Sequence, residues 1–402
     1  MADSAETTLG ALVELTPGFP FASAGFTAEP DDIRLVRGDN VAQGSLRWAN
    51  AARWPRTEPV DPKYHLQVGD VVLAMDRPWI EAGLKYAELR SVDVPSYLVQ
   101  RVARLRAKPG TDQRYIAHIV GSRAFTEYVL AIQTGSAVPH ISGPQIASFV
   151  LTPHSLEEQR AIAEVLGALD DKIAANTRLA AAADNLATVL FRKTVAGASM
   201  GPAAFDTVAT IGGGGTPSSK TPEYWDGDVK WASPTDITRL GGPYLFDTSR
   251  RITELGLAKC SSRLYPEGSI LMTSRATIGA FAIAQTPVAV NQGFIVVVPP
   301  DNTLRYWLLH EMRDRVEEFL THANGATFLE LSRGNFRKLQ VRLADAGKME
   351  SFGQRAAALH SAAAAALRQN LALAATRDAI LPALMSGKLR IRDAQNVVSD
   401  IC

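Results

Sequence analysis

The sequence predicts an α/β (α+β) protein: two similar mixed α/β domains separated by two long helices that pack as an antiparallel coiled coil. The first observation behind this prediction is an internal repeat. The pair Ile141-Ser142 is repeated as Leu331-Ser332, 190 residues later, and Gly387 follows Gly197 by the same 190 residues. Two long segments therefore match in length, as in a chain with a pseudo-two-fold internal repeat.

The second observation is a repeated strand pattern upstream of each long segment. LQVGDVVLAMDR (66–77) resembles YPEGSILMTSR (265–275) when Gly69 is aligned with Gly268. Each stretch has a turn glycine, an apolar run of strand length and a polar tip with an arginine. The chain is therefore expected to run domain, helix, domain, helix.

The first domain is predicted over residues 1–152. Residues 33–41, 70–76 and 96–105 are rich in apolar residues over short runs and predict strands. Residues 114–132 carry apolar side chains at helical spacing and predict an amphipathic helix.

The first long helix is predicted within residues 153–200. No proline follows Pro153 for about forty residues, and Ser155 with Glu158 makes a capping box at the start. Apolar or small residues then recur at spacings of four and three, which is typical of a coiled-coil seam. The seam residues predicted to form the helix interface are Ile162, Leu166, Leu169, Ile173 and Asn176.

The second domain, residues 201–346, repeats the order of elements. Strands are predicted at 229–237, 269–274 and 293–299, and a helix at 305–322.

The second long helix is predicted within residues 347–390, followed by a tail at 391–402. Its seam is rich in alanine and includes Leu359, Asn370 and Leu373. If the helices are antiparallel, Asn176 and Asn370 can pair and fix their register. The alternative, left open by the sequence, is that each asparagine lies beside the seam in water.

Composition narrows the class of protein. A chain of 402 residues suggests more than one domain. No apolar run is long enough for a membrane span, the start does not resemble a secretory signal, and the two cysteines are far apart. A cytoplasmic protein is expected. The net charge of +1 argues against strong DNA binding by the chain alone, unless basic residues are clustered or partners hold the phosphates.

Polar tips and loops supply the candidate DNA-contacting residues. Arg, Lys, Asn, Gln, Ser and Thr on loops are the types that read base edges, with aromatic residues nearby. GGGGTPSSKTPEYW (212–225) is a glycine-rich loop without the Gly-Lys-Ser/Thr ending of a phosphate loop. The predicted DNA-binding residues are Arg47, Asp76, Arg77, Lys220, Tyr224, Thr273, Ser274, Arg275, Asn291 and Gln292.

No catalytic constellation is apparent in the sequence. The only Pro-Pro, in VPPDNT (298–303), lacks the neighbours of an adenine methyltransferase motif, and there is no Walker A loop. The seven histidines show no metal-ligand spacing, so no metal site and no catalytic residue are predicted.

Four segments carry a resemblance to a known family. PHSLEEQRAIAEVLGALDDKI (153–173) resembles the central conserved region of type I restriction-modification specificity subunits. GGGTPSSKTPEYWDGDVKWASPTDI (213–237) and SILMTSRATIGAFAIAQTPVAVNQGF (269–294) resemble the start and core of their second target-recognition domain. GFPFASAGF (18–26) is similar to the opening of the first, so the match runs over nearly the whole chain.

The resemblance implies a non-catalytic subunit that reads a bipartite, gapped target in double-stranded DNA. It implies two methylation subunits and restriction subunits as partners, which carry S-adenosylmethionine, ATP and Mg, with no cofactor in this chain. In such subunits the helices set the gap and dock the methylation subunits. The second long segment departs from the family pattern, since GKMESFGQRAAALHSAAAAALRQN (347–370) lacks a clear Glu-Gln repeat.

The sequence leaves two other functions open. One is a two-domain coiled-coil scaffold or adaptor with no DNA-reading role, which the near-zero net charge favours. The other is a self-sufficient methyltransferase, against which the missing cofactor motifs argue.

Overall fold

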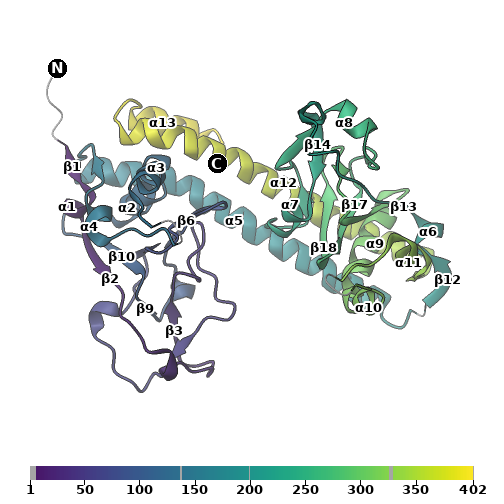
Figure 1. Ribbon diagram of the computed structural model, residues 1–402, viewed down its shortest axis with the longest axis horizontal. Helices are drawn as coiled ribbons and strands as arrows, with labels where there is room; N and C mark the ends of the chain where they lie inside the picture. Colours follow the sequence, from purple (N-terminus) through teal and green to yellow (C-terminus); the bar gives the residue numbers. More distant parts are fainter. Residues whose placement is uncertain (1–5, 136–137, 199, 326–328, 402) are drawn as a thin grey trace. The chain divides into compact units, whose positions relative to one another are not determined.

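The computed structural model describes residues 6–135, 138–198, 200–325 and 329–401 (Figure 1). Its contacts divide the chain into two compact units. Unit 1 holds the described residues up to Lys172 together with those from Ala372 onward, and unit 2 holds Ile173–Leu371. Each unit therefore contains one globular α/β part and parts of both long helices.

The main sheet of unit 1 has four antiparallel strands in the order β2-β10-β5-β8. They are β2 (Val13–Pro17), β10 (Val102–Ala107), β5 (Val71–Ala74) and β8 (Tyr86–Glu88). All four residues of β5 are buried, as expected for an apolar run in a central strand.

A second sheet of unit 1 has the order β4-β3-β9, with β9 (Ser96–Leu98) parallel to β3 (Ile33–Val36) and β4 (Arg53–Trp54) antiparallel to it. The single strand predicted at 96–105 is wrong, because the chain turns between β9 and β10. Arg101 takes a φ of 68° in that turn, and this left-handed conformation ends one strand before the next begins.

The helix predicted at 114–132 is also two elements, α2 (Gln113–Val120) and α3 (Arg123–Ile132). Gly121 follows α2, and the Ser122 side chain accepts a hydrogen bond from the Phe125 backbone N–H to cap α3. The remaining elements of unit 1 are short: β1 (Thr7–Thr8) paired with β11 (Val150–Leu151), α1 (Leu9–Leu12), α4 (Gly143–Ala147) and the hairpin β6 (Trp79–Ile80) and β7 (Gly83–Leu84).

The main sheet of unit 2 has five strands in the order β13-β20-β17-β18-β15. They are β13 (Thr210–Gly212), β20 (Phe294–Val298), β17 (Ile270–Arg275), β18 (Thr277–Ala284) and β15 (Tyr244–Leu245). The central strand β17 is buried at its first five positions, as β5 is in unit 1.

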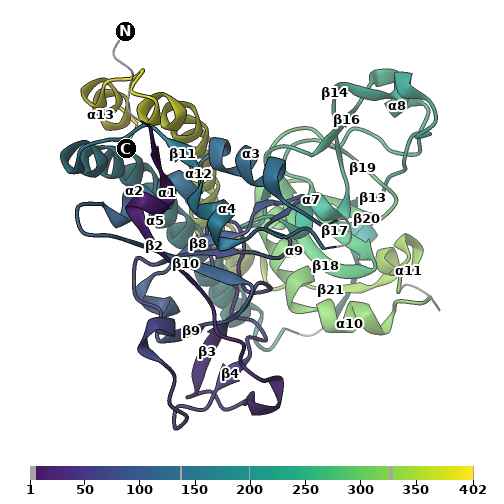
Figure 2. The same ribbon diagram turned by 60° about the vertical axis from the view of Figure 1, so that its left-hand side comes forward.

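A smaller sheet of unit 2 joins β16 (Arg250–Ile252), β14 (Trp225–Ala232) and β19 (Ala289–Val290), with β19 parallel to β14 (Figure 2). The predicted strand 229–237 is wrong beyond Ala232. Pro234 begins a short helix, α7 (Pro234–Thr238), and the Ser233 N–H donates to the Asp236 carboxylate at 2.7 Å. Proline suits a first helical turn and has no N–H to give to a sheet.

Helices and one strand pair complete unit 2. The predicted helix 305–322 is α9 (Asn302–Asp314) followed by α10 (Val316–Thr321), with Arg315 between them. The other elements are α6 (Phe205–Val208), α8 (Glu254–Ala258), α11 (Arg333–Lys338) and the pair β12 (Met200–Ala204) and β21 (Gln340–Arg342).

The two long helices are α5 (Leu156–Val195) and α12 (Ala346–Met385), each of 40 residues. At 1.5 Å per residue each is about 60 Å long. Gly197 and Gly387 follow them with φ of 79° and 70°, the left-handed conformation that commonly ends a helix. A last helix, α13 (Ile391–Ser399), lies within the segment predicted as a tail.

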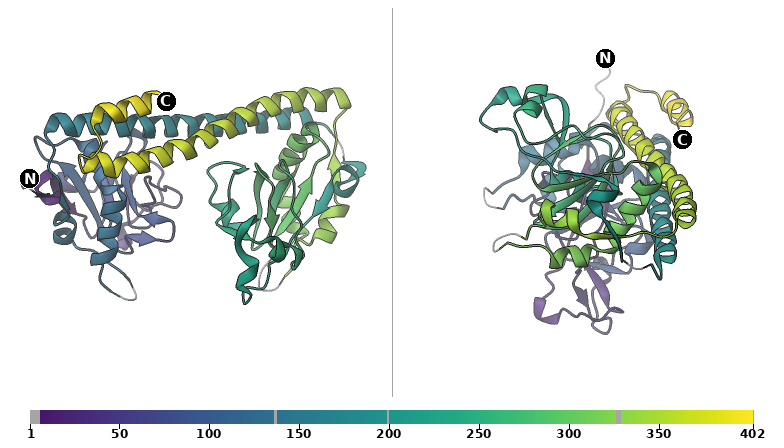
Figure 3. Two further views of the ribbon diagram at one scale, coloured as in Figure 1. Left: turned by 90° about the horizontal axis from the view of Figure 1, so that it is seen from above. Right: turned by 90° about the vertical axis from the view of Figure 1, so that its right-hand side faces the viewer.

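Within each unit the two long helices run antiparallel (Figure 3). In unit 1 the Arg377 guanidinium lies 2.7 Å from the Asp170 carboxylate. In unit 2 the Asn176 Nδ2 donates to Asn370 Oδ1 at 3.0 Å, and Phe191 packs against Phe352. The earlier half of α5 thus lies beside the later half of α12 in unit 1, and the reverse holds in unit 2.

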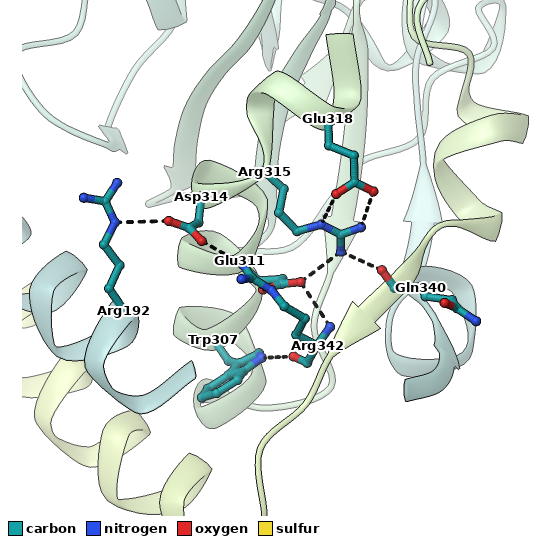
Figure 4. A network of polar contacts seen from close by, with 8 residues as sticks. All are labelled: Arg192, Trp307, Glu311, Asp314, Arg315, Glu318, Gln340 and Arg342. Atoms are coloured by element: carbon teal, nitrogen blue, oxygen red, sulfur yellow. Dashed lines mark hydrogen bonds and ion pairs between the residues drawn. The ribbon is translucent and has the colours of Figure 1, made fainter. Parts of the chain in front are cut away.

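A buried ionic network fixes α9, α10 and β21 of unit 2 (Figure 4). The Glu311 carboxylate is fully buried and accepts from the Arg315 guanidinium at 2.9 Å and from the Arg342 Nε at 3.0 Å. Arg315 also pairs with Glu318 at 2.6 Å, so the buried charges are matched. Asp314 extends the network to Arg192 of α5.

No helix within the described ranges is long and apolar enough to cross a membrane.

Candidate nucleic-acid interface

The polar tip after the repeated strand has the same backbone in both units. Arg77 has a φ of 44° and Ala276 a φ of 61°, so each takes the left-handed conformation that is uncommon for a residue with a side chain. Each donates its backbone N–H to a later segment, Arg77 to the Pro139 carbonyl at 2.6 Å and Ala276 to the Leu329 carbonyl at 3.1 Å. The same turn is therefore built twice.

A second segment lies beside each tip. It follows β9 in unit 1 (Val99–Arg101) and β19 in unit 2 (Asn291–Gly293). The Met75 N–H donates to the Arg101 carbonyl in unit 1, and the Ser274 N–H donates to the Gly293 carbonyl in unit 2, both at 2.8 Å. These bonds place Gln100 and Gln292 at equivalent positions.

A third segment follows β3 in unit 1 and β14 in unit 2. The Arg37 N–H donates to Asn40 Oδ1 at 3.1 Å, and the Ser233 N–H donates to Asp236 Oδ2 at 2.7 Å. In each case a side chain three residues ahead accepts from the first residue after the strand. All three segments thus repeat in matching conformations.

In unit 1 the three segments line a hollow of about 700 Å³. Its charged lining residues are four basic side chains against two acidic ones: Arg37, Arg77, Lys85 and Arg101 against Asp39 and Asp76. Two of the basic groups form ion pairs, Arg101 with Asp76 at 3.6 Å and Arg37 with Asp39 at 3.5 Å. The hollow therefore has an excess of positive charge, which suits an anionic ligand.

Lys85 is a half-buried cation of this hollow. Burial lowers the pKa of its ammonium group, opposed by the nearby carboxylate of Asp39, while Arg77 and Arg47 lower it further. Among the described residues no carboxylate lies within ion-pair distance of its Nζ. A partly desolvated ammonium group of this kind is a donor for a phosphate or for a guanine edge.

In unit 2 the three segments line a smaller hollow of about 370 Å³. The predicted residues Arg275, Asn291 and Gln292 meet there, together with Thr235 and Thr238 of α7. Arg275 lies 3.8 Å from the Glu330 carboxylate, and both side chains are about half exposed (49% and 48%). Such a surface pair is weak, so the guanidinium is available to a ligand.

The amides of the unit 2 hollow are held in place by local hydrogen bonds. Gln292 Oε1 accepts from the Thr216 hydroxyl at 2.6 Å, which ties it to the glycine-rich loop. Asn291 Oδ1 accepts from the Gly293 N–H at 2.8 Å. Arg275 offers donors of the kind that contact guanine in the major groove, and the two oriented amides place further hydrogen-bonding groups beside it.

Five of the ten predicted DNA-binding residues line one of the two hollows. Asp76 and Arg77 line the first hollow, and Arg275, Asn291 and Gln292 line the second. Thr273 and Ser274 are corrections: both are buried (0% and 3%). The Thr273 hydroxyl accepts from the Ala280 N–H, so it is part of the sheet and faces no ligand.

Three predicted residues lie away from the hollow linings. Arg47 is exposed and close enough to lower the pKa of Lys85, but it does not line the first hollow. Lys220 is exposed on the loop before β14, outside the second hollow. Tyr224 is half-buried and packs against the apolar cluster around Trp225, outside the second hollow.

The predicted residues do not include the other lining residues of the first hollow, among them Arg37, Lys85, Gln100 and Arg101. For Gln100 a signal was present. Aligning the runs that follow β9 and β19 sets Val99-Gln100 against Asn291-Gln292, which was predicted. Lys85 offered no such signal, because the equivalent residue opposite β17 is Ala280.

The predicted helix-interface residues lie along the seam to different depths. Asn176 and Leu373 are buried, while Asn370 is half-buried and donates to the Ile173 carbonyl at 3.1 Å. Leu359 is half-buried, and its neighbour His360 is the buried residue of that turn. Of the other predicted seam residues, Ile162, Leu166 and Leu169 are buried and Ile173 is half-buried.

No group of three or more His, Cys, Asp or Glu side chains among the described residues is arranged to hold a metal ion.

Comparison with known proteins gives one family match: residues 205–348 match the type I restriction modification DNA specificity domain. The chain is 37% identical over 136 residues to the MjaIX specificity subunit of Methanocaldococcus jannaschii, covering 33% of this chain and 32% of that protein. It is 33% identical over 162 residues to the EcoAI specificity subunit of Escherichia coli, covering 39% and 27%. The matches span about a third of the length of these relatives.

Among solved structures, the S subunit of a type I restriction-modification system from M. genitalium has a TM-score of 0.56 to this chain. The alignment covers 95% of this chain and 96% of that one, at 14% sequence identity. The likeness shows a shared fold: two mixed α/β parts and two long helices.

Proposed function

We propose that the chain reads DNA sequence for a type I restriction-modification complex, because residues 205–348 match the type I restriction modification DNA specificity domain and parts of the chain are similar to known specificity subunits. It binds a bipartite, gapped target in double-stranded DNA. It thereby directs adenine methylation and restriction, which its partner subunits perform.

One observation carries this proposal. Both units build a hollow from the same three segments, yet line it with different side chains. A shared backbone with different donors and acceptors is what a protein needs to read two different half-sites. The first hollow is cationic, whereas the second combines one arginine with two amides.

The partners proposed for this chain are two methylation subunits and, in the full complex, restriction subunits. They account for the net charge of +1, because subunits that hold the phosphates supply the non-specific affinity that this chain lacks. S-adenosylmethionine, ATP and Mg belong to these partners, and the chain itself is a non-catalytic recognition subunit. It acts where the cell's DNA lies, in the cytoplasm.

The long helices are proposed to dock the methylation subunits and to set the gap between the half-sites. Their antiparallel pairing is fixed by a polar cluster in the seam. Asn370 Nδ2 donates to the Thr177 hydroxyl at 3.1 Å, and Asn176 Nδ2 donates to Gln369 Oε1 at 2.9 Å. Paired amides in the seam give a coiled coil one register, which is needed if the helices are to set a fixed gap.

Selection from a duplex library tests the proposal. The complex of this chain with its methylation subunit is incubated with duplexes randomised over about 25 base pairs, and bound duplexes are sequenced at two salt concentrations. We expect a motif in two parts with a fixed gap, and affinity that falls as salt rises. A scaffold without a DNA-reading role would enrich no motif, and that result would remove the proposal.

A further inference from the structure

The two hollows share one side chain at an equivalent position. The three segments set Arg37 against Ser233, Asp39 against Thr235 and Val99 against Asn291, and at the polar tips Asp76 lies opposite Arg275. Gln100 and Gln292, by contrast, are the same residue in the same place. Where every neighbour of a position differs, an identical side chain indicates a contact that both half-sites have in common.

The hydrogen bonds of the two glutamines show which group each offers to a ligand. Gln292 Oε1 is occupied by the Thr216 hydroxyl. The Phe19 N–H donates to the Leu98 carbonyl and the Gly215 N–H donates to the Val290 carbonyl, so these two residues are equivalent. The next residues, Pro20 in unit 1 and Thr216 in unit 2, are therefore equivalent too, and Pro20 has no hydroxyl to donate. Both glutamines are exposed, and neither Nε2 group donates to another described residue. The group common to both is therefore the amide donor.

A constant donor among varying neighbours fits an acceptor that does not depend on sequence. Base edges change from one half-site to the other, whereas the phosphate oxygens are present in every duplex and accept from side-chain amides. Bidentate reading of adenine would need the Gln292 carbonyl as well as its amine, and the Thr216 hydroxyl already takes one of the two lone pairs of that carbonyl and fixes its direction.

We propose that Gln100 and Gln292 are positioning residues, each donating its Nε2–H to one DNA phosphate at the same place in its half-site. This inference rests on the proposed function. The two contacts set each domain in the same orientation on the duplex, while the varied residues around them read the bases. Loss of either glutamine weakens binding without changing the sequence that is preferred.

The test combines glutamine variants with duplexes in which one phosphate at a time is replaced by an uncharged methylphosphonate. The protein is the complex with the methylation subunit, and the duplex carries the motif that the library selection yields. For the wild type we expect replacement to weaken binding at several phosphates, because the methylation subunits also hold the backbone, and one of these phosphates in each half-site is the one contacted by the glutamine. Gln100→Ala should weaken binding about ten- to a hundredfold, the range of a single hydrogen bond to a charged acceptor, and should make binding insensitive to replacement at one of those phosphates. Gln292→Ala should do the same at the other.

Two further variants separate positioning from general damage. Gln100→Glu places a carboxylate beside the phosphate, so it should weaken binding more than Gln100→Ala, and most at low salt. Gln340→Ala is the control, because Gln340 is an exposed residue of β21 outside both hollows, and it should bind as the wild type does.

The outcomes distinguish this inference from the proposed function. If Gln100→Ala or Gln292→Ala changes the preferred base at one position, the glutamine reads sequence and the inference is overturned, while the proposed function stands. Unchanged affinity in both alanine variants also overturns the inference. If the wild-type complex selects no motif, the proposed function fails and the inference fails with it.

Discussion

Replacing Glu311 by glutamine tests the buried network that holds the helices of unit 2. Glu311 is fully buried, and its two oxygens accept three hydrogen bonds: from Arg315 at 2.9 Å, and from the Arg342 backbone N–H and Nε at 3.1 and 3.0 Å. Glu311→Gln keeps the size of the side chain but removes its negative charge. It also turns an NH₂ group toward a guanidinium or a backbone N–H, where an acceptor is needed.

The expected cost follows from burial and from the partners that remain. Removing one member of a buried ion pair costs about 3–5 kcal/mol in the free energy of unfolding, because the partner charge stays buried. Arg315 keeps Glu318, and Arg342 keeps Asp314, at 2.6 and 2.8 Å. We therefore expect a loss near the lower end, about 3 kcal/mol. Glu318→Gln should cost less, about 1–2 kcal/mol, since Glu318 is more than a third exposed (38%) and solvent screens it.

Urea unfolding followed by tryptophan fluorescence measures these costs, with the transition of each unit analysed separately. Glu317→Gln is the matched control, because Glu317 is the exposed neighbour of this network and its substitution should change stability by less than about 0.5 kcal/mol. A cost below about 1 kcal/mol for Glu311→Gln would refute the reasoning that these buried charges depend on one another.

Three further predictions follow from the site and the helices. Arg275→Ala should relax base preference in one half-site only, by about 1–3 kcal/mol of discrimination, and Arg77→Ala should do so in the other. Library selection measures this preference, and a uniform loss of affinity for all duplexes would show that these residues only hold phosphates. His310 and His360 face each other in unit 2 with their Nε2 atoms 3.0 Å apart, and burial lowers their pKa values to about 2 and about 4. The unfolded state therefore binds more protons below about pH 6.5, so the stability of unit 2 should be full above that pH and fall by about 1.4 kcal/mol per pH unit for each histidine as the pH drops toward 4. Urea titrations at several pH values measure this slope, and a slope unchanged in the double variant His310→Leu, His360→Leu would assign it to other groups. Adding one heptad to both long helices lengthens each by about 10 Å, or about three base-pair steps. Methylation mapping should then show a longer tolerated gap, and an unchanged gap would show that the helices do not set it.

The long helices were predictable from sequence because their signals are local. A capping box and a proline-free run predict α5, and an alanine-rich seam with a terminal glycine repeated 190 residues later predicts α12, although α12 contains Pro382. The sequence left open whether the seam asparagines pair or lie in water. In the structure they pair, with Asn176 Nδ2 donating to Asn370 Oδ1 at 3.0 Å.

The predictions failed where one residue interrupts an otherwise regular pattern. Pro234 ends a strand that the apolar run continues, and Ser122 caps a new helix inside a periodic stretch. Each effect is stronger than the average preference of its neighbours. The strand ending at Ala232 and the helix ending at Val120 show the outcome.

The candidate site was predictable in unit 2 but only in part in unit 1. Arg275, Asn291 and Gln292 are polar residues on recognisable loops, and the structure brings them together. Thr273 looked equally suitable but is buried, because which side of a strand faces solvent depends on the packing of the whole sheet. Lys85 lies across the sheet from β5, and no sequence spacing reveals such a pairing.

Methylation of cellular DNA tests the central claim most directly. The chain is co-expressed with its neighbouring methylation subunit, and methylated adenines are mapped by long-read sequencing of the host DNA. We predict a gapped, two-part motif that disappears when this chain is omitted and changes in one half only with Arg275→Ala. A stable complex that produces no new methylation, or an ungapped motif that persists without this chain, would contradict the account.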